Sequence, residues 1–396
     1  MRAALRIALV ALMLPQTSGT QAVRTVAGSP TLEVAPKHDA LGRVLTTFRF
    51  GDSTLAVVDQ SSMRVRYFDT KGREASSVGA RGSGPGEFRT ILFVGACAPG
   101  EISLFDQALN RVTTFDAAGR RLSILPARPL GPVGYYPGNA PSPYALACGA
   151  TGLRLLVGWP ESAGPPREGP HRAPVGIAFA DGGGTYRRLG TFAGPERFRY
   201  RSSDGPRFFG RKTVVAVGLS RLFVGTADSM MIEVFDRNGT LIERLRERSQ
   251  RRPLTERDRR AWAAQLERRF LGQFSRTQVQ ATLSQASLPE DLPAYDRFIA
   301  VGDTLWVEDA VAPSDSVRRW TVFKPGVGAV GRVTVPSCLE IHQVLGDEVI
   351  GKWIAVDGSE HVRVYRLIDP PTAAGQRAIR RASIQRERLE DICHVD

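Results

Sequence analysis

Residues 55–72 read LAVVDQSSMRVRYFDTKG, and residues 102–119 read ISLFDQALNRVTTFDAAG. Both stretches begin with an apolar run that ends in Asp, and both close on Phe-Asp-x-x-Gly after the same interval. Residues 221–239, RLFVGTADSMMIEVFDRNG, repeat the pattern with one extra residue. The alternating side chains before Phe68 predict β-strands, and Asp-x-x-Gly predicts a tight hairpin turn. A repeated unit of this kind predicts successive copies of one supersecondary structure.

The same unit recurs along most of the chain. Further copies occupy residues 153–183, 305–326 and 349–367. Six units, each with four antiparallel strands, predict an all-β fold, namely a six-bladed β-propeller in which radial packing leaves only short strand edges. A two-sheet sandwich is the alternative, but a sandwich does not need this periodicity.

The two ends of the repeated region predict how the ring closes. The last unit lacks a fourth strand, because Asp369-Pro370-Pro371 stops it. A strand-like segment, Thr31–Val34, stands alone before the first complete unit. We therefore expect Thr31–Val34 to pair with the strand that contains Val362–Tyr365.

Residues 249–293 break the strand pattern. Thr255-Glu-Arg-Asp258 has the form of a helix-capping box, and Trp262, Leu266 and Phe270 recur at helical spacing. Prolines at positions 289 and 293 end the stretch. We predict a helical hairpin inserted between blades four and five, as a packed buttress or as a lid or docking element.

The first 22 residues have the features of a secretory signal peptide. Arg2 and Arg6 precede the apolar run Ile7–Leu14, and small residues at Thr20 and Ala22 suit a cleavage site. The run is too short for a bilayer, which needs about 20 apolar residues. We expect export to the periplasm or beyond, with no transmembrane segment. The expected division is a signal peptide at 1–22, a propeller at 23–370 and a basic C-terminal tail at 371–396.

Export makes disulfide bonds possible. The four cysteines, Cys97, Cys148, Cys338 and Cys393, allow three pairings. Cys97 and Cys148 each precede a short turn and hold equivalent places in successive units. We predict a Cys97–Cys148 bond between neighbouring blades and a Cys338–Cys393 bond that ties the tail to the last blade. Four reduced thiols are the alternative.

Residues 79–88, GARGSGPGEF, resemble the inter-blade signature of NHL-repeat propellers, G-x-x-G-x-G-P-G-E-F. The resemblance implies that the glycines let the crossing chain turn tightly and that Phe88 packs into the next blade. Over residues 31–368 the chain also resembles secreted bacterial six-bladed propellers of unassigned function. Related propellers include metal-dependent lyases and lactonases, whose ligands lie on inner strands around the central channel.

Two polar side chains are candidates for such a channel. Glu340 and His342 are two residues apart on an expected inner strand, so their side chains share one face. They could join a divalent metal site, or they could line the channel as a polar pair without a metal. The strand-ending carboxylates Asp59, Asp106 and Asp309 are predicted to form turns rather than a carboxylate ring.

Three arginines are candidates for a basic rim. Arg43, Arg89 and Arg211 precede equivalent strand ends at similar spacing, so we expect them on the same rim of the ring. Converging guanidinium groups can hold a carboxylate, a phosphate or a sulfated sugar through paired hydrogen bonds. Scattered surface arginines are the alternative.

Composition narrows the function further. With 42% hydrophobic and 23% charged residues, the chain can build a core, and part of its formal net charge of +13 reflects an arginine-rich composition rather than a selected binding surface. The expected export and the lack of aromatic interleaving exclude nucleic acid. We expect a monomeric binding module, without a cofactor, whose loop face engages an anionic glycan, a peptide or a protein. A lyase- or lactonase-like enzyme with a divalent metal in the central channel is the alternative, and a cell-surface scaffold is a third possibility.

Overall fold

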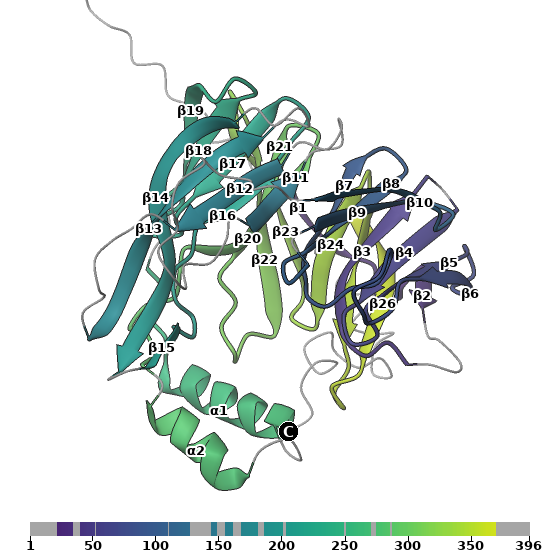
Figure 1. Ribbon diagram of the computed structural model, residues 1–396. Helices are drawn as coiled ribbons and strands as arrows, with labels where there is room; N and C mark the ends of the chain where they lie inside the picture. Colours follow the sequence, from purple (N-terminus) through teal and green to yellow (C-terminus); the bar gives the residue numbers. More distant parts are fainter. Residues whose placement is uncertain are drawn as a thin grey trace, which may run out of the picture.

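Strands make up most of the protein. The computed structural model describes residues 22–34, 40–51, 53–109, 111–126, 144–148, 155–160, 168–180, 186–200, 203–248, 251–270, 275–285 and 287–369. Two helices accompany the strands of these residues (Figure 1), and the predicted all-β fold class is confirmed. In the described part of the chain, neither helix is long and apolar enough to cross a membrane.

Consecutive strands pair antiparallel into groups, which we number in chain order. Group one contains β3 (Val44–Phe50), β4 (Thr54–Asp59), β5 (Arg64–Phe68) and β6 (Glu74–Val78). Group two contains β7 (Ile91–Ala98), β8 (Glu101–Asp106), β9 (Arg111–Asp116) and β10 (Arg121–Pro126). Group three contains β11 (Tyr144–Cys148), β12 (Leu155–Pro160), β13 (Gly169–Ala180), β14 (Tyr186–Tyr200) and β15 (Ser203–Pro206). Group four contains β16 (Val214–Val217), β17 (Arg221–Gly225), β18 (Met231–Asp236) and β19 (Leu241–Arg246).

The remaining strands form one larger sheet with two antiparallel halves. Group five contains β20 (Tyr295–Val301), β21 (Thr304–Asp309), β22 (Val317–Lys324) and β23 (Gly328–Pro336). Group six contains β24 (Leu339–Leu345), β25 (Glu348–Ile354) and β26 (Glu360–Ile368). The N-terminal strand β1 (Ala22–Val26) joins the halves, because it runs parallel to β23 and antiparallel to β26.

The predicted closing pair is confirmed. The short strand β2 (Leu32–Val34) pairs antiparallel with β26, with Leu32 opposite Val364 and Val34 opposite Val362. The backbone N–H of Thr31 also donates to the carbonyl of Val364 at 2.8 Å. The N-terminal segment therefore supplies the outer strand that group six lacks.

Apolar clusters lie between successive groups. Clusters join groups one and two, three and four, four and five, and five and six. A further cluster joins the last group to the first, with Val362 and Val364 packed against Val57 and Phe68. The first strands also touch in order, since β20 contacts β24 and β24 contacts β3. Radial packing of small antiparallel sheets, in chain order and returning to the start, is the architecture of a β-propeller.

The repeated turn explains why the strand pairs form. In the Phe-Asp-x-x-Gly hairpin of group one, the Asp69 carboxylate accepts hydrogen bonds from the backbone N–H groups of Lys71 and Arg73 at 2.8 and 3.0 Å. Gly72 has a φ of +73°, and an added Cβ would lie 2.5 Å from the carbonyl oxygen of Glu33. Because Glu33 lies on β2, position 72 has no room for a side chain where the closing strand passes.

The link between groups one and two, residues 79–88, makes a tight turn at Gly79. Gly79 has a φ of +93°, and an added Cβ would lie 2.7 Å from the carbonyl oxygen of Met63. Phe88, at the end of the link, is fully buried, and its ring centroid lies 6.3 Å from that of Phe115 in group two. The residues of the motif therefore fill the space between the two groups.

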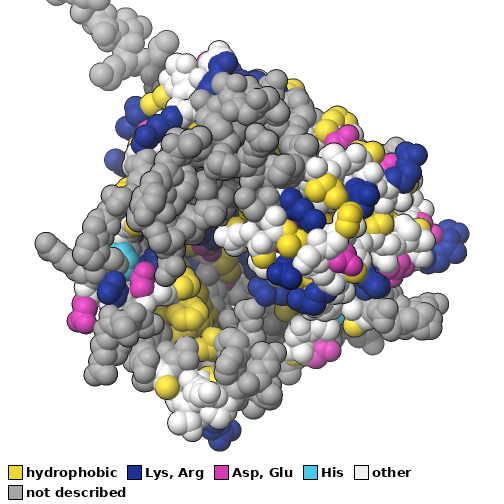
Figure 2. Space-filling view, in the orientation of Figure 1, with side chains coloured by type: hydrophobic (Ala, Val, Ile, Leu, Met, Phe, Trp, Pro, Cys, Tyr) yellow, Lys and Arg dark blue, Asp and Glu magenta, His cyan; other side chains and the backbone are white. Residues whose placement is uncertain are grey.

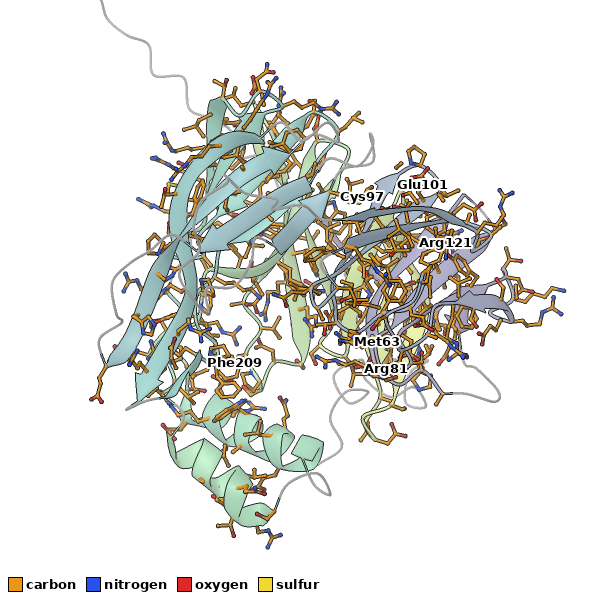
Figure 3. The ribbon with its side chains drawn as sticks, viewed as in Figure 1. Met63, Arg81, Cys97, Glu101, Arg121 and Phe209 are labelled. Carbon is orange, nitrogen blue, oxygen red and sulfur yellow. A yellow bond between two sulfur atoms is a disulfide. The ribbon has the colours of Figure 1, made fainter. Side chains whose placement is uncertain are left out.

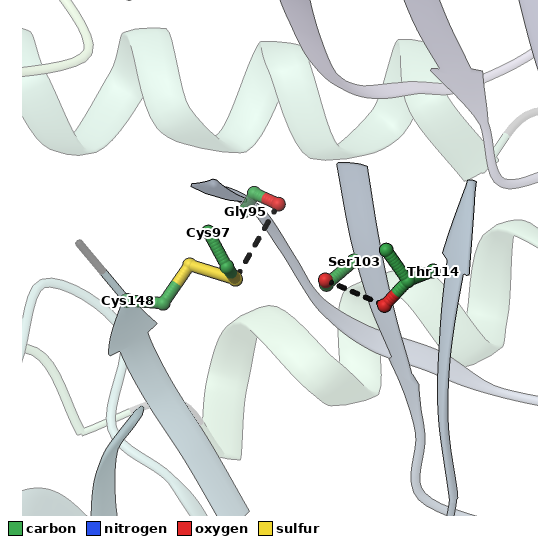
Figure 4. Close-up of a disulfide and its surroundings, with 5 residues drawn as sticks. All are labelled: Gly95, Cys97, Ser103, Thr114 and Cys148. Atoms are coloured by element: carbon green, nitrogen blue, oxygen red, sulfur yellow. Dashed lines mark hydrogen bonds between the residues drawn. A yellow bond between two sulfur atoms is a disulfide. The ribbon is translucent and has the colours of Figure 1, made fainter. Parts of the chain in front are cut away.

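A disulfide connects groups two and three. Cys97 on β7 is bonded to Cys148 on β11, with 5.2 Å between their Cα atoms (Figure 4). The first predicted pair is therefore confirmed. Cys338 is also disulfide-bonded, but Cys393, its predicted partner, lies outside the described residues.

Two helices lie between β19 and β20. They are α1 (Glu256–Phe270) and α2 (Arg276–Gln285). The capping box forms, since the N–H of Thr255 donates to the Asp258 carboxylate at 2.9 Å and the N–H of Asp258 donates to the Thr255 hydroxyl at 3.2 Å. Trp262 of α1 packs against the rings of Phe208 and Phe209, which fixes the helices to the sheets. Phe209 lies beside α1 (Figure 3).

Some expectations fall on residues that the structure does not describe. The expected signal peptide, apart from Ala22, and the basic tail lie outside the described residues. Parts of groups two and three, including residues 127–143 and 149–154, do as well. The number of blades therefore stays a prediction at this point.

Candidate functional site

Carboxylates at the end of a group's second strand anchor the chain where it enters the first strand of the same group. Asp59 accepts hydrogen bonds from the backbone N–H groups of Arg43 and Ser61 at 3.2 and 3.0 Å. Burial opposes ionisation of Asp59, but hydrogen bonds from Ser61, Arg43 and Ser62 hold its pKa below the ordinary value. Asp106 likewise accepts the N–H of Arg89 at 2.6 Å. The predicted turn-forming role is confirmed for both aspartates.

The three predicted rim arginines hold equivalent backbone positions. Arg211 precedes β16, and its N–H donates to the Glu196 carboxylate at 2.9 Å, as the N–H groups of Arg43 and Arg89 do to their aspartates. The side chains differ, because Arg43 and Arg89 are exposed, whereas Arg211 lines a cavity that the other two do not reach. A shared anion site of all three stays a prediction.

Glu340 and His342 lie on β24, as expected for the first strand of a group. Glu340 accepts a hydrogen bond from Arg297 of β20 at 2.9 Å and lies 3.4 Å from the ammonium of Lys352. His342 is only 4% exposed, and its Nε2 lies 3.6 Å from the Glu340 carboxylate. Burial lowers the pKa of His342, so the imidazole is held neutral.

Glu340 belongs to a continuous line of alternating charges, which we call the axial network. Its members are Arg297, Arg318 and Lys352 among the cations and Glu308, Glu340 and Glu360 among the carboxylates. Glu308 is 1% exposed and lies between Arg297 and Arg318, at 2.7 and 3.1 Å. Although burial opposes it, Arg297 and then Arg318 hold the pKa of Glu308 below its usual range.

The axial network satisfies its own charges. Glu360 also accepts the N–H of Val44, and Lys352 donates to the carbonyl of Val44 at 3.3 Å, so the line reaches group one. Its ion pairs and hydrogen bonds connect groups five, six and one, which is a structural role. Among the described residues, no group of three or more His, Cys, Asp or Glu side chains is placed to hold a metal ion.

A second set of charges surrounds a cavity of about 400 Å³ between groups four and five. We call it the basic cavity. Its wall carries the arginines Arg211, Arg248, Arg251, Arg252, Arg319 and Arg332 and the carboxylates Asp228, Glu247 and Asp309. The wall therefore has more positive than negative groups, and apolar side chains such as Met230 and Leu292 complete it.

Strand pairing and the base of the helical segment position this wall. Arg332 of β23 lies directly opposite Thr321 of β22, and Arg319 is two residues from Thr321, so the three side chains share one face. Arg252 lies just before α1, where the N–H of Leu292 donates to its carbonyl at 2.8 Å. The start and the end of the helical segment are thus tied together beside the cavity.

Most of the cavity's arginines have acidic partners. Arg332 pairs with Glu247, and Arg252 forms a two-pronged contact with Asp315. Among the described residues, neither Arg248 nor Arg319 has an ion-pair partner. These two guanidinium groups leave positive charge available to a ligand.

Asp309 differs from the other strand-ending aspartates, and the predicted turn-forming role is wrong for it. Asp296 instead accepts the N–H of Val311 at 3.1 Å, and Asp315 accepts the N–H of Ala312 at 2.7 Å. Asp309 is half-buried, and its carboxylate accepts no hydrogen bond from the described residues. Burial, only partly offset by Arg332 and Arg319, raises its pKa to about 6.

Sequence reasoning did not identify Arg248, Arg319 or Asp309 as a set. The one available signal was the basic run 244–252, where arginines follow the outer strand of group four. Figure 2 shows Lys and Arg side chains in several separate patches of the visible face, together with a hydrophobic surface in the hollow above the helices. Side-chain type alone therefore does not single out the basic cavity.

The chain shares its fold with solved structures that are distant in sequence. No protein family matches the chain, and no curated protein matches it significantly. It is similar to a member of the DUF4221 family from Bacteroides vulgatus, at a TM-score of 0.51 and 10% identity, over 89% of this chain and 100% of that one.

Two further structures have lower scores. A candidate exported protein from Bacteroides fragilis matches at a TM-score of 0.46 and 10% identity, over 89% of this chain and 100% of that one. Virginiamycin B lyase from Staphylococcus aureus matches at 0.41 and 10%, over 84% of this chain and 98% of that one. At such identities the likeness concerns the fold alone.

Proposed function

We propose that the protein is an exported six-bladed propeller that binds an anionic ligand, namely a glycan, a peptide or a protein segment, in the basic cavity. The observation that carries this proposal is the pair of arginines, Arg248 and Arg319, that line the cavity without an ion-pair partner among the described residues. Guanidinium groups bind carboxylate, phosphate and sulfate through paired hydrogen bonds.

The size and lining of the cavity support this proposal. Small-ligand sites are concave, mostly apolar pockets of about 300–1,000 Å³ with a few placed polar groups. The basic cavity, at about 400 Å³, falls within this size range, but its wall is mainly charged and so suits an anionic ligand better than an apolar one. The surplus of positive charge also attracts anions from a distance and speeds their association.

The finer architectural features belong to the same proposal. Six strand groups, closed by β2, suit six blades, and the buried Phe88 suits an NHL-like link between blades. The leader-like residues 1–22 and the Cys97–Cys148 bond suit an exported protein. A channel metal has weaker support, because Glu340 is already held by Arg297 and Lys352.

The test compares two double variants with the same change in charge. Mature protein would be titrated with labelled sulfated oligosaccharide and with oligoglutamate at low and high salt, followed by fluorescence anisotropy. Arg248→Ala with Arg319→Ala should weaken binding at least tenfold, because each charge-assisted hydrogen bond contributes roughly 1.5–3 kcal/mol. Arg43→Ala with Arg89→Ala is the matched control and should leave binding within about twofold.

Each outcome has a clear meaning. Equal losses in both double variants would show that only general surface charge attracts the anions, which would overturn the proposal. A loss confined to the Arg43 and Arg89 variant would place the anion site at the predicted rim instead of in the cavity.

A further inference from the structure

We infer that the ligand of the basic cavity is an acidic saccharide, whose anionic groups bind Arg248 and Arg319 while one of its hydroxyl groups donates to Asp309. This inference rests on the proposed function and narrows it to one ligand class. It depends on the presence of an unpartnered carboxylate among unpartnered cations.

Asp309 is placed to receive a donor from outside the protein. A carboxylate offers about four acceptor sites, and Asp309 is half-buried in the cavity wall, where a ligand can reach it. Asp59 and Asp106, at the same place in their groups, each accept hydrogen bonds from at least two backbone N–H groups. Because Asp296 and Asp315 have taken over that role in group five, Asp309 faces the cavity with its acceptors free of the described residues.

The donor that suits Asp309 is neutral. Arg332, Arg319 and Arg252 are the cations whose charge acts on Asp309. An ammonium group brought to Asp309 would be repelled by these guanidinium groups, whereas a hydroxyl group would not. This condition disfavours a lysine side chain or a free amino terminus as the group that meets Asp309.

The ligand must carry anionic groups for the two arginines. It must also carry a hydrogen-bond donor for Asp309, so a ligand that has only hydrogen-bond acceptors does not fit. A sulfate ion or a run of glutamate side chains would place oxygen acceptors against the carboxylate of Asp309. A uronate or sulfated sugar carries its anionic group and several hydroxyl groups on one ring, so it can satisfy Arg319 and Asp309 together. The apolar side chains of Met230 and Leu292 offer contact to the C–H groups of the ring.

The experiment uses three ligands of equal length: an oligouronate, the same oligosaccharide with its carboxyl groups reduced to alcohols, and oligoglutamate. The native protein should bind oligouronate best, and carboxyl reduction should weaken binding at least tenfold. Asp309→Ala should weaken oligouronate binding about tenfold and leave oligoglutamate binding equal or stronger. Asp309→Asn, which keeps one acceptor oxygen, should recover part of the oligouronate affinity.

The possible outcomes distinguish the saccharide assignment from the broader proposal that the basic cavity binds anions. If Asp309→Ala strengthens binding of both anions alike, Asp309 only repels anions, and the saccharide assignment fails while anion binding stands. If oligoglutamate binds as well as oligouronate, the ligand is an acidic peptide, and the assignment also fails. If no anion depends on Arg248 and Arg319, both statements fail. Thermal melting of each variant verifies that it is folded.

Discussion

The axial network and the basic cavity are both built from arginines and carboxylates, but their charges are paired differently. In the axial network Glu308 lies between two arginines and Glu340 lies between Arg297 and Lys352. In the basic cavity, Arg248, Arg319 and Asp309 have no such partners among the described residues. The number of charged side chains therefore does not distinguish a candidate binding site in this protein. Charged side chains that line a cavity without an ion-pair partner do.

The largest expected effect comes from breaking the axial network. Glu308→Ala leaves Arg297 and Arg318 without their shared carboxylate, which should lower the free energy of unfolding by about 4 kcal/mol. Arg319→Ala, in the same group but in the cavity, should change it by less than about 0.5 kcal/mol. Urea denaturation measures both values. Similar losses in the two variants would remove the distinction between the regions.

The junction between groups two and three is held by a disulfide bond, whereas ion pairs hold the axial network. Replacing Cys97 and Cys148 by Ser opens a link between residues 51 positions apart. Because the bond restricts the unfolded chain, its loss should lower the free energy of unfolding by about 3 kcal/mol. Oxidised and reduced native protein should differ by more than oxidised and reduced forms of the variant. An unchanged urea midpoint would show that groups two and three hold together without it.

The pH dependence of binding sharpens the description of the cavity. The pKa of Asp309 is raised to about 6, so its carboxylate is charged at pH 7 and largely neutral at pH 5. Loss of that negative charge should strengthen binding of a fully sulfated oligosaccharide several-fold as the pH falls through 6. Asp228 and Glu247, the other carboxylates of the wall, are held in ion pairs. Asp309→Asn should flatten the profile; a slope that persists in this variant would assign the effect to another group.

The smallest effect is expected at the exposed rim. Arg43→Ala and Arg89→Ala remove side chains that have no ion-pair partner among the described residues and keep their backbone N–H bonds to Asp59 and Asp106. Each should change the free energy of unfolding by less than about 0.5 kcal/mol. A thermal melt that shifted by several degrees would show that these side chains do more than face solvent.

Local features of the molecule were predictable from the sequence because they depend on near neighbours. The Asp69 turn, the Thr255–Asp258 capping box and the closing strand β2 each follow from residue types at fixed spacing. The Cys97–Cys148 bond was predictable because the repeat places both cysteines in equivalent positions.

The sites that depend on contacts between groups were not predictable in the same way. Arg297 and Glu340 are 43 residues apart and meet because β20 and β24 lie side by side. Asp309 has the sequence position of a turn-forming aspartate, and only the competing hydrogen bonds of Asp296 and Asp315 free it. A single sequence does not show which of several nearby carboxylates will accept the hydrogen bond of a given backbone N–H group.

The closing strand also sets an order of events during biosynthesis. Of the described strands, β2 is among the first that the ribosome makes and its partner β26 is the last, with Glu33 and Arg363 separated by 330 residues. Such a distant pairing must wait until β26 has been made, and it is slow because a long loop must close. Until then, both strands present unpaired edges that could join other chains. A nascent molecule therefore depends on being kept apart from its neighbours until β2 and β26 have paired.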